Sequence, residues 1–439
     1  MSKFFRLIVL LCAVLCSQNI YAQDVYKHTL SIDEMFRLAD EKSQRIKMSE
    51  TILESASESV KAAKAERMPE IELSASVSHL GNGRIWDRDF SDGQSVSIPH
   101  FGNNFSLMAS QVIYSGGAIS SGIDLAKLGE KMANADLEKN KQEVRFQLTG
   151  DYLNIYKLTN QEKVFNNNIE LTKMVINNMR SRHKEGTALK SDITRYELQL
   201  EQFKLKLAKV QDARQIMNHH MITTLHMPEN SEIAPDSTLL PQNIMTQKEN
   251  DWQVLATESN KILEQAELAI DINKKKLKLE RSAQLPKLAV VAENNLNGPI
   301  TIEIPAIDKN FNYWFVGLGV KYNISSLFKS NKKISAAKLT VRSAEEGFSL
   351  ASEQIENAVH TSYTDLITSY TELHTCIKSI ELANENYKVV VNRYENDLAL
   401  LTELLDAANM KLNAELDLVN ARINVVYNHY KMKYITHTL

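Results

Sequence analysis

The feature that most constrains the fold is an internal duplication. A constant offset of 211 residues aligns the two halves of this 439-residue chain without a gap over about a hundred positions. Residues 126–128 and 337–339 are both Ala-Lys-Leu, and residues 169–171 and 380–382 are both Ile-Glu-Leu. Two repeats of more than 200 residues are too long for solenoid units, so the sequence predicts one domain present twice.

Each repeat shows the order helix, two strands, then two long helices. The first opening helix begins at Ser31, which can cap it, and extends towards Arg67, and its counterpart covers residues 251–283. Alternation of apolar and polar residues predicts strands at about 70–80, 103–114, 287–295 and 313–323.

The helices that follow the strands are predicted to be unusually long. The chain has only 14 Gly and 8 Pro, and between Gly122 and Gly186 it contains no Pro. A helix of about 60 residues there would extend about 90 Å. Returning helices carry apolar residues in a 4-3-4-3 spacing, so we expect helical hairpins at residues 122–226 and 332–435 that pack as coiled coils or in a helical bundle.

The first 22 residues have the pattern of a secretory signal peptide. Lys3 and Arg6 precede a short apolar stretch, and Ala22 suits the position before a cleavage site. Leu15 makes Cys16 a poor lipoprotein acceptor, and cleavage would leave Cys376 as the last cysteine, so no internal disulfide is expected. No other stretch has 18 consecutive apolar residues, which leaves a β-barrel as the way for the mature chain to cross a membrane.

The four predicted strands allow two interpretations. About ten alternating residues suit a soluble sheet with one packed face, and they equally suit tilted membrane-spanning strands. Four strands cannot close around themselves in lipid, so a spanning sheet would require oligomerisation, and three chains would supply twelve strands.

The motifs at the junctions and tips resemble those of the TolC family of outer-membrane efflux proteins over nearly all of the mature chain. They are residues 111–117 (Gln-Val-Ile-Tyr-Ser-Gly-Gly), Gly186, residues 404–407 (Leu-Leu-Asp-Ala) and residues 418–422 (Leu-Val-Asn-Ala-Arg). The resemblance implies a mainly α fold with a membrane portion: a homotrimer with a twelve-stranded β-barrel and a long α-helical barrel. Residues 23–226 and 251–439 would be the repeats, and residues 227–250 an equatorial linker.

The resemblance also implies a function and partners. The chain would be the exit duct, in the outer membrane of a Gram-negative bacterium, of a tripartite efflux or type I secretion system. It would passively conduct substrates from an inner-membrane pump of the RND or ABC type through a periplasmic adaptor (membrane fusion) protein. The alternative is a periplasmic coiled-coil structural or adaptor protein, against which the duplication and the strand pairs argue. The transported substrate stays open.

Residues of a periplasmic gate follow from the resemblance. Tyr394 would link to Asp192, with Ser191 as a further polar partner, and Ala399 stands where a second family link has an arginine. Glu403 and Asp406 would form an acidic constriction, since residues three apart share a helical face. Such acidic rings favour cations and offer divalent ions a blocking site, whereas on its own the pair suits a solvated charged face.

The hairpin tips are predicted to contact the adaptor. They are Gly186, Thr187, Ala188 and Leu189 in the first repeat, and Asp397, Leu398, Ala399 and Leu400 in the second. Exposed apolar residues at a tip are typical of a contact surface. Because Asp397 stands where the first tip has a glycine, the two docking grooves should differ.

Nothing in the sequence indicates catalysis, a cofactor or a metal site. His219 and His220 are adjacent and His226 follows six residues later, so the i, i+4 spacing of a helical metal pair is absent. There is no phosphate-binding loop or nucleophile elbow. A formal charge of −3 offers no basic surface for nucleic acid.

Overall fold

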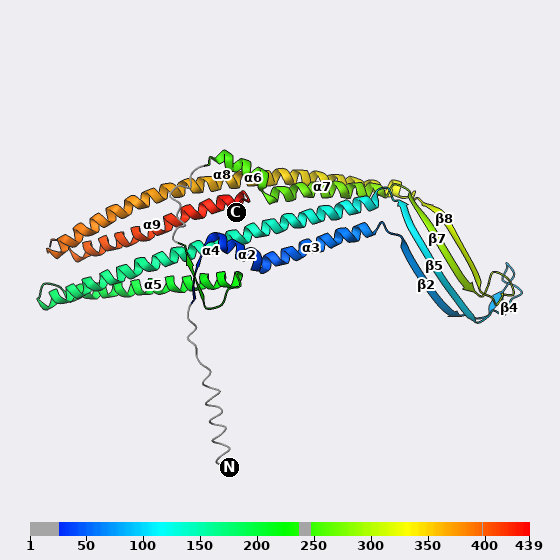
Figure 1. Cartoon of the computed structure of the whole chain (residues 1–439), viewed down its shortest axis with the longest axis horizontal. Coiled ribbons are helices and arrows are strands. Elements are labelled where there is room, and N and C mark those ends of the chain that lie inside the picture. Colours follow the sequence, from blue (N-terminus) through cyan, green and yellow to red (C-terminus); the bar gives the residue numbers. More distant parts are fainter. Residues whose placement is uncertain (1–25, 237–246, 397) are drawn as a thin grey trace, which may run out of the picture. The chain divides into compact units, whose positions relative to one another are not determined.

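The computed structural model describes residues 26–236, 247–396 and 398–439 (Figure 1). The predicted signal peptide and tip residue Asp397 lie outside the described residues. The chain divides into two compact units. The first unit is built from the segments up to residue 48, 139–260 and 355–439, and the second from residues 49–138 and 261–354.

The second unit contains a four-stranded antiparallel sheet in the order β2, β5, β7, β8. Its strands are β2 (Glu70–His79), β5 (Phe101–Tyr114), β7 (Lys287–Gly298) and β8 (Phe311–Lys321). Each lies where the alternating pattern predicted a strand. The two middle strands come from different repeats, so the duplication joins two strand pairs into one sheet (Figure 1).

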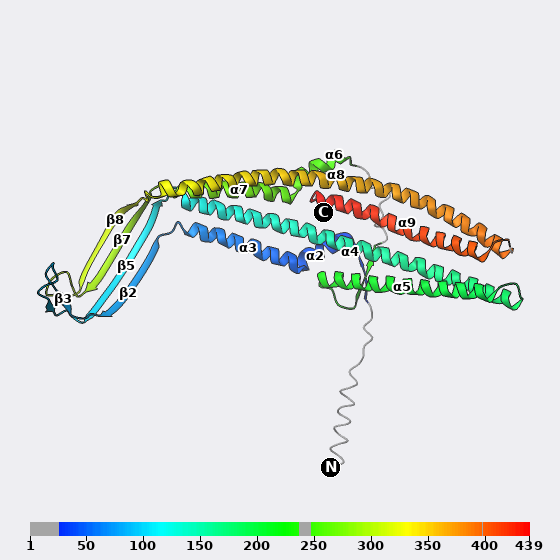
Figure 2. The same ribbon diagram turned by 180° about the vertical axis from the view of Figure 1, so that it is seen from behind.

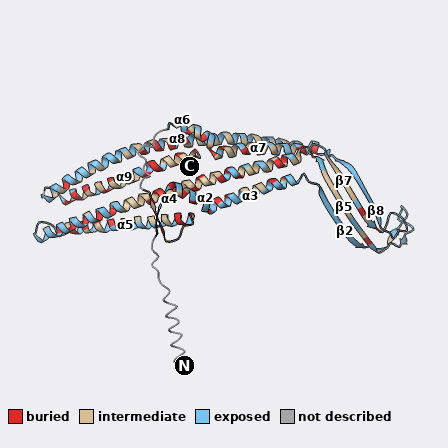
Figure 3. Cartoon of the chain, in the orientation of Figure 1, coloured by how far each residue is buried: buried red, intermediate tan, exposed pale blue. Residues whose placement is uncertain are grey.

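The register gives this sheet one apolar face, since directly opposed residues share a face. The face carries Ile71, Leu73, Phe105, Leu107, Trp314, Val316 and Leu318. It is interrupted by Asn294 and Asn312, whose amides are 3.2 Å apart in a hydrogen bond. The opposite face, called the polar face below, includes Glu72, Ser74, Ser106, Glu293 and Asn295. Strands β2 and β8 are exposed at every position, and Figure 3 shows no layer covering the sheet.

The sheet passes into a long helix through two glycines. Gly116 and Gly117 have φ values of +66° and +83°, in the left-handed region that favours glycine. A Cβ on Gly116 would lie 2.8 Å from Cβ of Leu285, so this site also requires the smallest residue. Helix α4 (Ala118–Lys184) starts directly afterwards, and its counterpart α8 (Ser326–Glu395) follows β8. Each of these helices contributes residues to both units.

The remaining helices of the second unit are α3 (Gln44–Ala65), apart from its first turn, and α7 (Lys261–Ser282). Asp124 of α4 is 2.7 Å from the ammonium of Lys275 on α7, and Asp136 accepts a hydrogen bond from Gln265 at 2.6 Å. These contacts tie α4 to α7 within the unit.

The first unit contains two helical hairpins that repeat the same geometry. Helix α5 (Lys190–Thr224) returns beside α4, and α9 (Leu401–Ile435) returns beside α8 in both views of the chain (Figures 1 and 2). The bounds of α5 and α9 differ by the sequence offset of 211 at both ends. His226 and His437, related by the same offset, both have left-handed φ values, +48° and +54°. The two repeats therefore share helix ends and backbone conformation as well as sequence.

The expected apolar stripes form the core between the hairpins. Phe165 and Ile169 on α4 pack with Phe203 on α5 and Leu412 on α9. In Figure 3 buried residues recur along these helices. Burial of these stripes supplies the main favourable free energy of the unit.

The opening helix of each repeat is broken once, which differs from the single helices predicted. Helix α2 (Ile32–Lys42) stops at Ser43 before α3, and α6 (Glu249–Ser259) stops at Asn260 before α7. Neither break has a Pro or Gly. The Asn260 side chain is buried and donates to the carbonyl of Ile435 at 2.8 Å, so a tertiary contact stabilises the second break.

Two short parallel strands were not predicted. Strand β1 (Tyr26–Leu30) pairs with β6 (Ser231–Pro235), which begins in the segment expected to be a linker. Tyr152 of α4 is fully buried beside them: its hydroxyl donates to the carbonyl of Leu30 at 2.6 Å and accepts from the N–H of Asp236 at 2.8 Å. Burial raises the pKa of Tyr152 to about 12. A small hairpin, β3 (Gly83–Ile85) with β4 (Gln94–Val96), lies between β2 and β5.

In the part of the chain that the structure describes, no helix contains an apolar stretch long enough to cross a lipid bilayer.

Candidate functional site

The two hairpin tips share one long backbone hydrogen bond. At the first tip the N–H of Thr187 donates to the carbonyl of Arg182 at 2.9 Å. At the second tip the N–H of Leu398 donates to the carbonyl of Arg393 at 2.8 Å. Both are the long closing bonds of a Schellman motif, which ends a helix and turns the chain.

Gly186 provides the left-handed residue that the first motif needs. Its φ is +78°, and no atom lies within 4 Å of the place a Cβ would occupy. Glycine is therefore required there by backbone conformation rather than by lack of space.

The tip segments present leucines to solvent. Leu189, Leu398 and Leu400 are 67%, 68% and 69% exposed. Thr187 is exposed, whereas Ala188 and Ala399 are half-buried. Three exposed leucines on short turns form an apolar surface whose burial would be favourable.

Beneath the tips the hairpins are held together by a buried cluster, called the tip core below. It consists of Ile176, Met179, Ile193, Tyr196, Val390, Leu401, Leu404 and Ala407. Tyr196 is only 3% exposed, and its burial raises the pKa of the phenol. Because all four long helices contribute, movement of one tip must carry the other with it or disrupt this core.

Tyr394 contacts the first hairpin through an arginine. The guanidinium of Arg182 lies 5.4 Å from the centre of the Tyr394 ring, and its Nη1 donates to the Tyr394 carbonyl at 3.4 Å. Such a cation–π contact is worth about 0.5–1 kcal/mol at an exposed site. Arg182 and Arg393 occupy equivalent positions in the two repeats, 211 residues apart.

The other predicted members of the gate link lie at the start of α5. Asp192 is half-buried in the first turn of α5, where its N–H donates to the Leu189 carbonyl at 3.1 Å. Ser191 precedes it and is exposed. The link between Tyr394 and Asp192 stays a prediction.

Glu403 and Asp406 are both exposed in the first turns of α9. Glu403 has a partner within the chain, since its carboxylate lies 3.6 Å from Nη2 of Arg393. The two side chains are 43% and 50% exposed, so the pair is solvated and weak. Arg393 also donates to the Leu398 carbonyl at 2.9 Å, which places its charge against the tip backbone. Sequence reasoning missed this pair because it crosses the turn.

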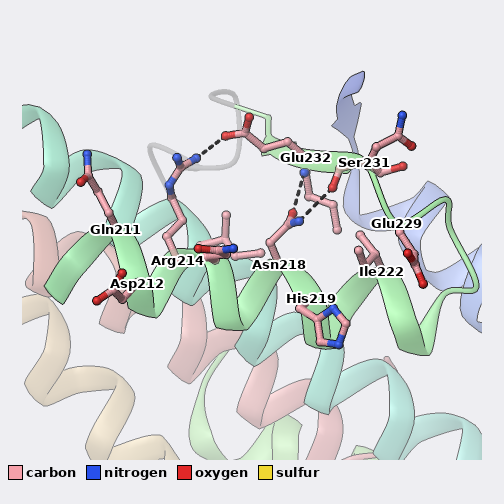
Figure 4. A pocket seen from close by; sticks show the side chains of 13 residues that line it. Gln211, Asp212, Arg214, Asn218, His219, Ile222, Glu229, Ser231 and Glu232 are labelled. Atoms are coloured by element: carbon pink, nitrogen blue, oxygen red, sulfur yellow. Dashed lines mark hydrogen bonds and ion pairs between the residues drawn. The ribbon is translucent and has the colours of Figure 1, made fainter. Parts of the chain in front are cut away.

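A hollow of about 560 Å³ lies in the first unit between α5 and β6 (Figure 4). Arg214 points between two carboxylates, with Nε 3.3 Å from Glu162 and an ion pair to Glu232. Asn218 donates to the Ser231 carbonyl and accepts from the Ile233 N–H, both at 2.8 Å. These groups hold β6 on α5, so the polar side chains of the hollow are largely committed to the fold.

Within residues 26–236, 247–396 and 398–439, no three His, Cys, Asp or Glu side chains gather as a metal site would require. His219 borders the hollow in Figure 4.

The comparisons with known proteins agree on one architecture. The family model described as outer membrane efflux protein matches residues 36–223 and 252–429, one segment in each repeat and more than half of the chain. No protein with a curated description matches.

Several solved structures share the fold. VceC from Vibrio cholerae is 12% identical, with a TM-score of 0.76, over 92% of this chain and 96% of that one. The MtrE outer membrane channel of Neisseria gonorrhoeae, in its open state, is 14% identical, with a TM-score of 0.74, over 92% and 88%. The Campylobacter jejuni CmeC outer membrane channel is 14% identical, with a TM-score of 0.71, over 93% and 85%.

Proposed function

Because the chain belongs to the outer membrane efflux protein family, we propose that it is an outer-membrane exit duct of a tripartite efflux or type I secretion system. It conducts substrates passively, and the energy for transport comes from a partner pump. The observation that carries the proposal is the four-stranded sheet with one apolar face, joined to two matched helical hairpins.

The sheet supports an oligomer, and the family supports three copies. Strands β2 and β8 are the edges of the sheet, and their apolar residues are exposed. Unpaired edges are not tolerated in lipid, so edge β8 of one copy must pair with edge β2 of the next. Three copies give a barrel of twelve strands with its apolar face towards lipid and its polar face towards the channel. The solved channels MtrE and CmeC, to which the chain is similar, support this assignment.

Membrane fractionation with native mass measurement tests the assignment. We expect the full chain in the outer membrane and a purified mass of three protomers. A monomer in the periplasmic fraction would refute the duct and favour the alternative, a periplasmic coiled-coil or adaptor protein.

We propose further that the hairpin tips form the gate. In a trimer, Glu403 and Asp406 would put six carboxylates around the constriction, three of them paired with Arg393. Removing the acids in a Glu403→Ala, Asp406→Ala variant should lower cation selectivity and divalent block in planar bilayers. A Glu201→Ala, Glu170→Ala variant, changed at exposed acids of the first hairpin, is the matched control. Unchanged selectivity and block would remove the acids from the gate.

The exposed leucines of the tips are proposed to dock a periplasmic adaptor, which connects the duct to an inner-membrane pump. A Leu189→Asp, Leu400→Asp variant should lose co-purification with the adaptor expressed in the same cells. Leu205→Asp is the control, because Leu205 is 58% exposed on α5 away from the tip. Equal loss in the control would contradict a docking role for the tips.

A further inference from the structure

The polar face of the sheet changes character on its last strand. On β2, β5 and β7 it carries mostly Ser, Asn and Glu, as a channel-facing surface should. On β8 the same face carries Phe311, Tyr313 and Phe315, called the aromatic row below. Since Trp314 and Val316 occupy the apolar face, this part of β8 is apolar on both sides. The requirement for a lipid-facing surface does not explain the row.

The three rings form a continuous exposed surface. Phe311 and Tyr313 stack, with ring centres 5.4 Å apart and planes inclined by 29°. Phe311, Tyr313 and Phe315 are 52%, 39% and 44% exposed. Because they alternate along one strand, their Cα atoms are about 6.6 Å apart, and a flat molecule can contact two of them.

A carboxylate is placed beside the row. Glu293 lies directly opposite Phe315 on β7, and its Oε1 accepts a hydrogen bond from Asn295 at 2.7 Å. Asn295, opposite Tyr313, is only 9% exposed, so it fixes the carboxylate on this face. On the other side of Glu293, Met108 of β5 lies directly opposite it, and Glu72 of β2 lies opposite Met108.

The basic residues of this face lie at its other end. Lys287 and Lys321 oppose each other there, six residues along β8 from Phe315, or about 20 Å. Within the strands, Glu293 therefore lies beside the aromatic row while the two lysines lie about 20 Å from it, which favours a cation at the rings.

We propose that the aromatic row and Glu293 form a transit site for amphipathic aromatic cations on the channel wall. The inference rests on the proposed function, which places the polar face towards the channel. A delocalised cation is attracted by the ring faces and by the carboxylate, while its apolar body covers exposed ring surface. Each copy in the trimer supplies one such site.

Block of single-channel current tests the site. Tetraphenylphosphonium and tetrabutylammonium are both bulky monovalent cations, and only the first is aromatic. In the unmodified trimer we expect tetraphenylphosphonium to block at the lower concentration. In a Phe311→Leu, Tyr313→Leu, Phe315→Leu variant, which keeps apolar bulk, its half-blocking concentration should rise about threefold to tenfold, with little change for tetrabutylammonium. An Asn104→Ser, Asn297→Ser variant, changed on the same face, should keep the difference.

Glu293→Gln should weaken block by both cations. Equal block by the two cations in the unmodified trimer, or block unaffected by the leucine variant, would overturn the proposal while leaving the duct intact. Loss of SDS-resistant trimers in the leucine variant would instead assign the row to packing between copies. Absence of current from folded, unmodified trimers would refute the proposed function itself.

Discussion

Replacing the buried Tyr152 by phenylalanine should loosen the β1–β6 pair specifically. The change removes one hydroxyl that donates to the Leu30 carbonyl at 2.6 Å and accepts from the Asp236 N–H at 2.8 Å. Tyr152 is 0% exposed, so water cannot easily replace the hydroxyl. At about 1 kcal/mol for each buried hydrogen bond, the expected loss is about 2 kcal/mol.

Hydrogen exchange measured by mass spectrometry localises this loss. A local free-energy change of about 2 kcal/mol corresponds to exchange about 30-fold faster in peptides covering residues 26–30 and 231–236. The control is Tyr363→Phe at the repeat-equivalent position, where the ring packs at the edge of the cluster around Trp252. An equal acceleration in the control, or none in Tyr152→Phe, would refute the assignment of these bonds as the clamp on β1 and β6.

Three further predictions concern the tips and the response to pH. Gly186→Ala should cost about 1 kcal/mol of unfolding free energy, because φ is +78° and no steric clash arises, and faster exchange confined to residues 182–190 would show it. Tyr196→Ala should destabilise the tip core by about 3–5 kcal/mol and Tyr196→Phe far less, as measured by urea unfolding; similar midpoints for both would contradict the assigned burial. The pKa of Tyr152 is raised from 10 to about 12, so the unfolded state loses this proton first. Its contribution to stability is thus complete below about pH 10 and decreases as pH rises towards 12, and Tyr152→Phe should flatten that part of the thermal-midpoint profile.

The duplicated architecture could be predicted from sequence because it depends on patterns that survive at a fixed offset. Helices α5 and α9 lie one offset apart at both ends, and His226 and His437 repeat even an unusual backbone conformation. The strands were predictable for a similar reason, since apolar residues recur at every second position along the face of the sheet that suits lipid.

Features set by tertiary contacts were not predictable. The helix break at Asn260 depends on its bond to Ile435, far along the chain, and no helix-breaking residue signals it. Strands β1 and β6 are five residues each and pair in parallel, which leaves no local turn signal.

The candidate gate was predictable only in part. The residues at the tips follow from the repeat and the family motifs. The partner of Glu403 depends on how the turn brings the start of α9 back beside Arg393 on α8. The contact of Arg182 with Tyr394 likewise depends on how the two hairpins pack. The carboxylate of Glu403, which the sequence alone places on a solvated charged face, is thus partly neutralised by Arg393 in the structure.

Three copies of this chain are proposed to enclose a continuous duct. Single-channel recording from the purified, unmodified protein in a planar bilayer tests it most directly. We expect discrete ion-current steps from the trimer that are cation-selective and reduced by divalent ions. Folded trimers that insert into the bilayer and pass no current would contradict it.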